Sequence, residues 1–335
     1  MEFKKYNTIE NAYRKKTIDY FVAKRVTNDE FVVQEKAHGA NLSFWYDGNE
    51  LKSAKRSGFI NDDFYNYQPV EKEYQGRLKQ LYTLLNEIGY RINVLVVYGE
   101  LIGGTYPHEE VKKNTSSTII QKGVYYSPTN EFYAFDVSVN GDLLNIDTFN
   151  RVMEETNFLY AKPIFRGTFN ECLKYTNEFP SKIPGWLGLP EIKYNICEGI
   201  VIKPIRPMFF DGGSRVILKS KNEIWSERAQ KRDIVKKEMP TLSEAGKKLY
   251  SEIELLITEN RLCNVLSKTG SIAQEEFGKL LYHFSQDILN DFHKDYSDAY
   301  NAIEKKEQKQ LTKQLNRECS KLIRFNFQNI IDGNF

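Results

Sequence analysis

Residues 35–41, Glu35-Lys36-Ala37-His38-Gly39-Ala40-Asn41, place a lysine at the end of a β-prone segment and directly before a glycine-containing turn. The preceding residues, Phe31 to Lys36, favour a strand. The residues that follow predict a hairpin of two strands, 41–46 and 50–55, joined at Asp47-Gly48. A turn after Lys36 would hold its amine out of the sheet, so Lys36 is a candidate nucleophile.

The rest of the first two thirds of the chain also predicts strands separated by turns. Val94 to Tyr98 is an apolar run short enough for a buried strand, and the main helix is expected over residues 71–92. The other expected strands are 132–139 and 143–146, joined at Asn140-Gly141, and then 198–203 and 215–221.

The pattern becomes helical after Lys221. Thr241 to Glu244 fits a capping box, and the tail 300–324 is helix-prone and charged. Apolar residues recur at helical spacing in two sets, Leu249, Ile253, Leu256 and Ile257, and then Phe277, Leu281, Phe284 and Ile288. We therefore expect a domain boundary near residues 225–240.

Length and composition exclude several classes of protein. The chain has 335 residues, enough for two domains, and with 41% hydrophobic residues it can form a sizeable core. It lacks an apolar run of the roughly 18 residues that a spanning helix needs, a secretory signal, and cysteine spacings typical of zinc or disulfide frameworks. We expect a soluble intracellular protein. A net charge of +2 means that phosphates must be bound by local clusters of cations.

Five further clusters lie at or beside the expected strands. They are Ala54-Lys55-Arg56-Ser57-Gly58, Tyr98-Gly99-Glu100, Phe132 to Asp136, Glu198 to Lys203, and Leu218 to Lys221.

These clusters supply the parts of a nucleotidyl-transfer site. A lysine amine has a reference pKa of about 10.4, and nearby cations such as Lys219, Lys221 or a metal would lower it and neutralise a phosphate under attack. Glu100 and Glu198 offer oxygen ligands for Mg²⁺ or acceptors for ribose hydroxyls. Phe135 could stack on a purine.

Each cluster also has a structural explanation. A lysine before a turn is usually solvated, and Lys219 and Lys221 share one face of a strand, as they would at a solvated edge. Phe135 could belong to the core, and the two glutamates could partner surface cations. All six clusters in this order, each beside an expected strand, are hard to explain by chance.

The six clusters resemble nucleotidyltransferase motifs I, Ia, III, IIIa, IV and V of the covalent superfamily of ligases and capping enzymes. Lys36 to Asn41 resembles the K-x-H-G-x-N of the phage-type RNA ligase 2 family, with His38 where polynucleotide ligases and capping enzymes usually carry Asp. Ala54 to Gly58 resembles that family's A-K-R-T-G. Phe3-Lys4-Lys5-Tyr6, Leu242 to Ala245 and Asn264 to Lys268 extend the similarity over nearly the whole chain.

This resemblance implies an α+β fold. Residues 1–232 would form an adenylyltransferase domain of antiparallel sheets with helices, of the ATP-grasp-like ligase type. Residues 233–335 would form a small all-helical C-terminal domain. A phage-type family leaves a virus or phage open as the source.

The resemblance also implies an ATP-dependent RNA ligase that repairs nicks in duplex RNA. Lys36 would form a lysyl-AMP with ATP, AMP would pass to the RNA 5′-phosphate, and the 3′-hydroxyl would displace it. The catalytic residues would be Lys36, His38, Lys219 and Lys221, and Glu198 and Glu100 would hold Mg²⁺ or Mn²⁺. The nucleotide-binding set would be Glu35, Lys36, Asn41, Arg56, Glu100, Phe135, Glu198, Lys203, Lys219 and Lys221.

Several alternatives stay open. A DNA ligase or capping guanylyltransferase would normally append an OB-fold of five strands, whereas residues 241–335 predict helices. A ligase that joins single-stranded RNA ends is opposed only by the same features. An RNA-binding module on an inactive scaffold would usually have lost Lys36, Glu100 or Glu198. RNA is the expected partner, with no membrane, and sealing one nick requires no more than a monomer.

Overall fold

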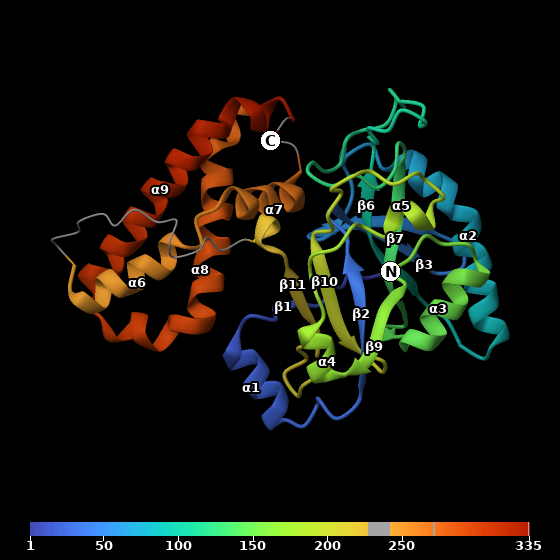
Figure 1. Ribbon diagram of the computed structural model, residues 1–335, viewed down its shortest axis with the longest axis horizontal. Coiled ribbons are helices and arrows are strands. Elements are labelled where there is room, and N and C mark those ends of the chain that lie inside the picture. Colours follow the sequence, from blue (N-terminus) through green and yellow to red (C-terminus); the bar gives the residue numbers. More distant parts are fainter. Residues whose placement is uncertain (227–241, 271, 334) are drawn as a thin grey trace. The chain divides into compact units, whose positions relative to one another are not determined.

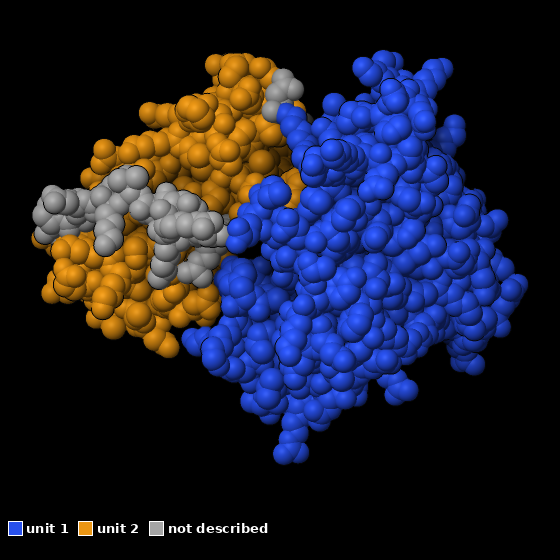
Figure 2. All heavy atoms as spheres, viewed as in Figure 1, with its two compact units in different colours: residues 1–224 blue, residues 225–335 orange. Residues whose placement is uncertain are grey.

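The computed structural model describes residues 1–226, 242–270, 272–333 and 335. The chain forms two compact units, residues 1–224 and 225–335 (Figure 2). The expected boundary between residues 232 and 233 lies outside the described residues and stays a prediction. None of the helices described is both long and apolar enough to span a bilayer.

The first unit contains two sheets (Figure 1). The first sheet has five strands, and its neighbours are antiparallel except for the parallel pair β1 and β11. In spatial order they are β1 (Glu10–Asn11), β11 (Leu218–Lys221), β10 (Gly199–Pro204), β2 (Glu30–Lys36) and β9 (Pro163–Thr168). Its outer face packs on α1 (Lys15–Ala23) and α4 (Phe169–Lys174) through a core that includes Phe21, Phe31 and Phe169.

The second sheet has six antiparallel strands. In spatial order they are β5 (Gly58–Phe59), β4 (Leu51–Lys55), β3 (Ala40–Tyr46), β6 (Leu95–Gly103), β7 (Asn130–Val139) and β8 (Asp142–Leu143). The helices α2 (Gln68–Glu87) and α3 (Ile146–Glu155) cover its outer face (Figure 1). Leu42, Val97, Ala134 and Val137 alternate onto that face and join its core.

The α+β class expected from the sequence is confirmed, as are the strands around the candidate nucleophile. The expected strand 143–146 is wrong beyond Leu143, because Asn145 caps α3 by accepting a hydrogen bond from the Thr148 amide. The strand β9 and the helices α1, α4 and α5 (Ile183–Trp186) were not expected.

The described part of the second unit is helical. After the 3₁₀ turn Glu223–Trp225, it contains α6 (Glu244–Glu254), α7 (Glu259–Thr269), the 3₁₀ turn Gln274–Glu276, α8 (Phe277–Ala302) and α9 (Lys305–Ile331). Ser243 caps α6, while Thr241 of the expected capping box lies outside the described residues. The two predicted apolar stripes meet in one core. Arg261 is buried beside it and bridges Asp287 and Asp291 of α8 at 2.8 Å each.

Candidate active site

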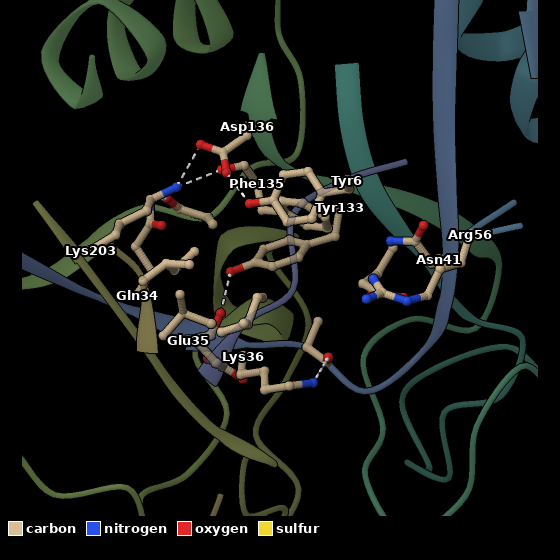
Figure 3. A pocket seen from close by; sticks show the side chains of 16 residues that line it. Tyr6, Gln34, Glu35, Lys36, Asn41, Arg56, Tyr133, Phe135, Asp136 and Lys203 are labelled. Carbon is tan, nitrogen blue, oxygen red and sulfur yellow. Dashed lines mark hydrogen bonds and ion pairs between the residues drawn. The ribbon is translucent and has the colours of Figure 1, made fainter. Parts of the chain in front are cut away.

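A pocket lies between the inner faces of the two sheets of the first unit (Figure 3). The empty space between its walls amounts to about 570 Å³, including the part open to solvent, within the range of small-ligand sites. The first sheet contributes Gln34, Lys36, Val201 and Lys203, and the second contributes Asn41, Glu100, Tyr133, Phe135 and Asp136.

Strand register brings the lysines of the first sheet to the same side. Lys36 of β2 pairs with Gly199 of β10, which pairs with Lys221 of β11. The next row inward joins Gln34, Val201 and Lys219 in the same way. Because directly opposed residues share one face of a sheet, Lys36, Lys219 and Lys221 belong to the face that lines the pocket.

Gly199 allows these strands to approach closely. Its φ is +149°, and a Cβ at this position would lie 2.1 Å from the Ser220 carbonyl oxygen. Any other residue would therefore push β10 away from β11, and Lys221 with it.

Glu198 joins the two outer lysines. The Lys36 amine lies 2.6 Å from Glu198 Oε2, and the Lys221 amine lies 2.8 Å from Oε1. The Glu198 side chain is only 1% exposed, and the Lys36 side chain is 19% exposed. Burial alone would raise the pKa of Glu198, but the charges of Lys221 and then Lys36 hold it at about 2.

His38 lies at the edge of this cluster. Its Nδ1 is 4.0 Å from Glu198 Oε2. Its backbone N–H donates to the hydroxyl of buried Tyr126 at 2.9 Å. The turn that follows Lys36 is therefore fixed from the loop that precedes β7.

Glu100 lies across the pocket in the second sheet. It pairs with Asn41 of β3 and with Tyr133 of β7, so the three side chains share the pocket face. Its Oε2 is buried and has no hydrogen-bond partner within the described part of the chain. Burial raises the pKa of Glu100 to about 7, against the lowering effects of Lys36 and Arg56.

A buried charge network forms another wall. Asp136 accepts hydrogen bonds from Lys203 at 2.9 Å, from Arg215 at 2.7 Å and from the Tyr6 hydroxyl. The Lys203 amine also donates to the Phe135 carbonyl at 2.8 Å. Burial lowers the pKa of Lys203 to about 8, although Asp136 opposes this shift.

A β-bulge in β7 lets both Phe135 and Asp136 reach the pocket. Tyr98 pairs with Asp136 but Gly99 pairs with Ala134, so Phe135 is an extra residue in the ladder. The Phe135 ring is partly exposed and packs edge-on against Tyr6, with centroids 5.1 Å apart.

Glu35 is turned differently from the expectation. Its carboxylate accepts hydrogen bonds from Ser181 Oγ at 2.6 Å and from the Lys182 amide at 2.7 Å, beside α5. Its backbone carbonyl accepts one from the Tyr133 hydroxyl at 3.1 Å, as Figure 3 shows. Burial raises the pKa of the Glu35 carboxyl to about 7. Any contact of Glu35 with a nucleotide would therefore be made by its backbone.

The side chains of the pocket can supply only some of the ligands that a metal ion needs. No group of three or more His, Cys, Asp or Glu residues in the described chain could hold one. Mg²⁺ is commonly bound by one or two carboxylates together with water and substrate phosphates. The unpartnered Glu100 oxygen and the Glu198 carboxylate fit that pattern.

The structure brings most of the sequence-predicted residues together. Seven line the pocket directly, and Glu198, Lys221 and His38 join it through the contacts of Lys36 and Glu198. Lys219 is placed by its register opposite Val201. Tyr6, Tyr133 and Asp136 lay within stretches that the sequence singled out but had no assigned role, and Gln34 was not singled out at all. Strand alternation could have found Gln34, two residues before Lys36.

Two family models match this chain. The RNA ligase model covers residues 29–221, which include every strand of the two sheets except β1. The model of the C-terminal region of T4 RNA ligase 2 covers residues 240–321. The first match spans more than half of the chain. The chain belongs to the RNA ligase family. The resemblance to the RNA ligase 2 family is thereby confirmed.

Two curated relatives of this ligase come from Trypanosoma brucei brucei. RNA-editing ligase 2, mitochondrial, is 29% identical over 98% of this chain and 92% of the relative. RNA-editing ligase 1, mitochondrial, is 33% identical over 53% of this chain, and the match spans 45% of that relative. These matches give no support to a viral or phage source, which the resemblance had left open.

Solved structures of Naegleria gruberi RNA ligase also align with the ligase. One, a mutant with ATP and Mn, has a TM-score of 0.44 and 15% identity over 67% of this chain and 57% of the other. Another, with AMP and Mn, has a TM-score of 0.45 and 15% identity over the same shares. The family assignment rests on the sequence matches alone.

Proposed function

We propose that this chain is an ATP-dependent ligase that seals nicks between a 3′-hydroxyl and a 5′-phosphate in duplex RNA. The observation that carries the proposal is the position of the Lys36 amine, which is ion-paired with Glu198 beside a pocket of nucleotide size. The side chains of Lys36 and His38 are 19% and 16% exposed, so both remain accessible. Membership of the RNA ligase family supplies the reaction class.

In the first step the Lys36 amine attacks the α-phosphorus of ATP. A nitrogen–phosphorus bond forms and the bond to pyrophosphate breaks. The Lys36 ammonium loses one proton to solvent before the attack and a second one after it, so the phosphoramidate nitrogen keeps one hydrogen. Lys221 and Lys219 lie on the same face of the sheet as Lys36 and would stabilise the charge that grows on the α-phosphate oxygens. Glu198 holds the attacking amine and Lys221 at fixed distances before ATP binds.

The nucleotide base fits the inner end of the pocket. The Phe135 ring is partly exposed and lines the pocket, so it offers a stacking surface for the base. Lys203 and Asp136 neutralise each other behind it. Arg56 and Asn41 line the outer part, where they would contact the ribose or the phosphates.

In the second step the RNA 5′-phosphate attacks the phosphorus of the lysyl-AMP, and the Lys36 nitrogen leaves. In the third step the 3′-hydroxyl attacks the 5′-phosphate phosphorus, and AMP leaves. We assign His38 to these later steps, because it lies next to Glu198 without entering the inner pocket.

A divalent cation, Mg²⁺ or Mn²⁺, would be held by Glu100 and Glu198 and would neutralise phosphate charge when bound.

A label-transfer experiment tests this proposal. The protein is incubated with α-labelled ATP and Mg²⁺, beside Lys36→Ala, and is then chased with nicked duplex RNA. We expect label on the wild type alone, lost as nicks close. If the label stays on the protein during the chase with nicked duplex RNA but is lost when single-stranded RNA ends are added, the protein joins single-stranded ends and does not seal nicks. No label on folded protein free of bound AMP would leave an inactive RNA-binding module.

A further inference from the structure

One face of α9 in the helical unit concentrates positive charge. Residues 305–324 carry seven Lys and Arg against two Glu, a net charge of +5. The whole chain has a net charge of only +2, so the remaining residues sum to −3. The excess is therefore local to this helix.

Six of these cations form a stripe along the helix, which we call the α9 stripe. Its members recur at intervals of three or four residues and are all exposed. At about 100° per residue they fall within a sector of roughly 120°, and at about 1.5 Å per residue they extend over some 27 Å. They are Lys306, Lys309, Lys313, Arg317, Lys321 and Arg324.

The two acidic residues of α9 neutralise at most one member of the stripe. Glu307 is turned towards α6, where its Oε1 accepts a hydrogen bond from the Ser243 amide. Glu318 accepts from Lys321 at 2.9 Å. Within the described chain, no carboxylate lies at ion-pair distance from Lys306, Lys309, Lys313 or Arg317.

The opposite side of α9 belongs to the core. Leu311, Leu315, Cys319 and Ile323 are fully buried against α6 and α8. A membrane-surface helix needs its apolar face available for insertion, so the stripe does not fit a lipid partner. A row of exposed cations, of which Lys321 is ion-paired with Glu318, lies on a helix whose other face is fixed in the core. Such a row fits a row of phosphates, which carry the charge in nucleic acids.

We propose that the α9 stripe binds the phosphate backbone of the duplex RNA substrate. This inference rests on the proposed function, because it names the surface by which the ligase would hold its nick. Double-stranded RNA is recognised largely through phosphates and 2′-hydroxyls, without sequence readout. The exposed cations of the stripe would contact the phosphates of one strand, so the binding would be independent of sequence and sensitive to salt.

The test compares two variants of the full chain with equal net charge. Lys309→Gln/Lys313→Gln/Arg317→Gln removes the centre of the stripe. The matched control Lys247→Gln/Lys248→Gln/Lys279→Gln removes three exposed cations of α6 and α8. Binding of nicked duplex RNA is measured without ATP across a range of salt concentrations.

We expect the stripe variant to bind roughly tenfold or more weakly near 0.1 M salt. The slope of log K against log salt should fall by about two to three, since each lost phosphate contact contributes roughly 0.7 to 0.9. The control should keep most of the affinity, and Lys309→Arg/Lys313→Arg should keep both affinity and slope. Equal affinity and equal slope in the stripe variant and the control would overturn the proposal.

Self-adenylylation separates this proposal from the proposed function. The stripe variant should take up label from α-labelled ATP at the wild-type level, because its changes lie outside the pocket. If the wild type takes up no label, the proposed ligase chemistry is refuted. The comparison of RNA binding still decides the role of the stripe in that case. Unchanged melting temperatures would confirm that the exposed substitutions leave the fold intact.

Discussion

The Lys36 amine lies 2.6 Å from Oε2 of Glu198, and the other oxygen of the same carboxylate holds Lys221. The candidate nucleophile is thus one of two cations that share a single buried anion. A lysine in an ion pair has no available lone pair, so Glu198 must loosen its contact with the amine before the attack. Substitutions of these two residues test the arrangement most directly.

Lys36→Arg should abolish covalent AMP. Arginine keeps the positive charge beside Glu198 but does not lose its proton at working pH, so it cannot act as the nucleophile. Gel autoradiography after incubation with α-labelled ATP measures the product, with Lys52→Arg, on β4 of the other sheet, as the control. Label on Lys36→Arg would assign the nucleophile to another residue.

Glu198→Gln should destabilise the protein by about 3 kcal/mol at pH 7, because it leaves Lys36 and Lys221 close together without their counter-charge. The folded pKa of Glu198 is about 2, below the ordinary value of 4.5. Its stabilising contribution is therefore complete above pH 4.5 and is lost as the pH falls through 2. Urea unfolding at pH 7 and pH 3 should show the larger difference at pH 7.

Glu50 provides the control for Glu198. It forms a surface ion pair with Lys52 at 3.1 Å, and such pairs contribute about 0–1 kcal/mol. If Glu198→Gln costs no more than Glu50→Gln, the buried pairs do not hold the site together.

Glu100→Gln should stabilise the protein above neutral pH while it lowers ligation. The folded pKa of Glu100 is about 7, above its ordinary 4.5, so the wild type loses stability as the pH rises from 4.5 to 7. The amide of Glu100→Gln does not ionise, so the variant should be more stable than the wild type by about 1–3 kcal/mol at pH 8. The gain is smaller than for a fully buried carboxyl, because Glu100 is partly exposed. Equal pH profiles for both proteins would contradict the raised pKa.

Tyr126→Phe should cost about 1–2 kcal/mol and weaken sealing. The change removes the acceptor of the His38 backbone N–H, which then loses its partner in a part-buried turn. Tyr125→Phe is the matched control, since Tyr125 is held through its backbone by Asn195. Thermal melts and sealing assays of the two variants should differ; identical results would show that the hydroxyl does not position the turn.

His38→Ala should retain part of self-adenylylation but lose most nick sealing. His38 lies beside Glu198, outside the inner pocket, so formation of lysyl-AMP depends on it less than the later steps do. Single-turnover assays of each step measure the difference, with His108→Ala as the control. Normal sealing by His38→Ala would remove this residue from the mechanism.

The sequence predicted the parts of the fold in which local pattern and tertiary role agree. The segments around Lys36 are rich in β-prone residues and are followed by turns that contain glycine, and β2, β3 and β4 form there. The strand β9 was missed because its sequence, Pro163 to Thr168, begins with proline, contains Gly167 and lies at a sheet edge. The β-branched and aromatic residues of α1 gave no clear helical signal.

The site was predicted where its residues lie inside compact motifs. Lys36, Glu100 and Glu198 each stand in such a motif and meet in space. The contact of Tyr6 with Asp136 could not be predicted, because the two residues are 130 positions apart and no local pattern links them. The carboxylate of Glu35 faces Ser181, because neighbouring residues of a strand point to opposite sides of the sheet. The sequence motif nevertheless grouped Glu35 with Lys36, and so its side chain was assigned to the pocket.

The extra residue in β7 has a consequence for the design of such sites. An ideal strand shows alternate residues to each side, so it could present either the Phe135 ring or the Asp136 carboxylate to the pocket, never both. Deleting one residue here would restore a regular ladder, but it would turn either Phe135 or Asp136 into the hydrophobic core between the sheet and the helices α2 and α3. The imperfection in the strand is thus the feature that allows one short segment to offer both a flat surface and an anchored charge.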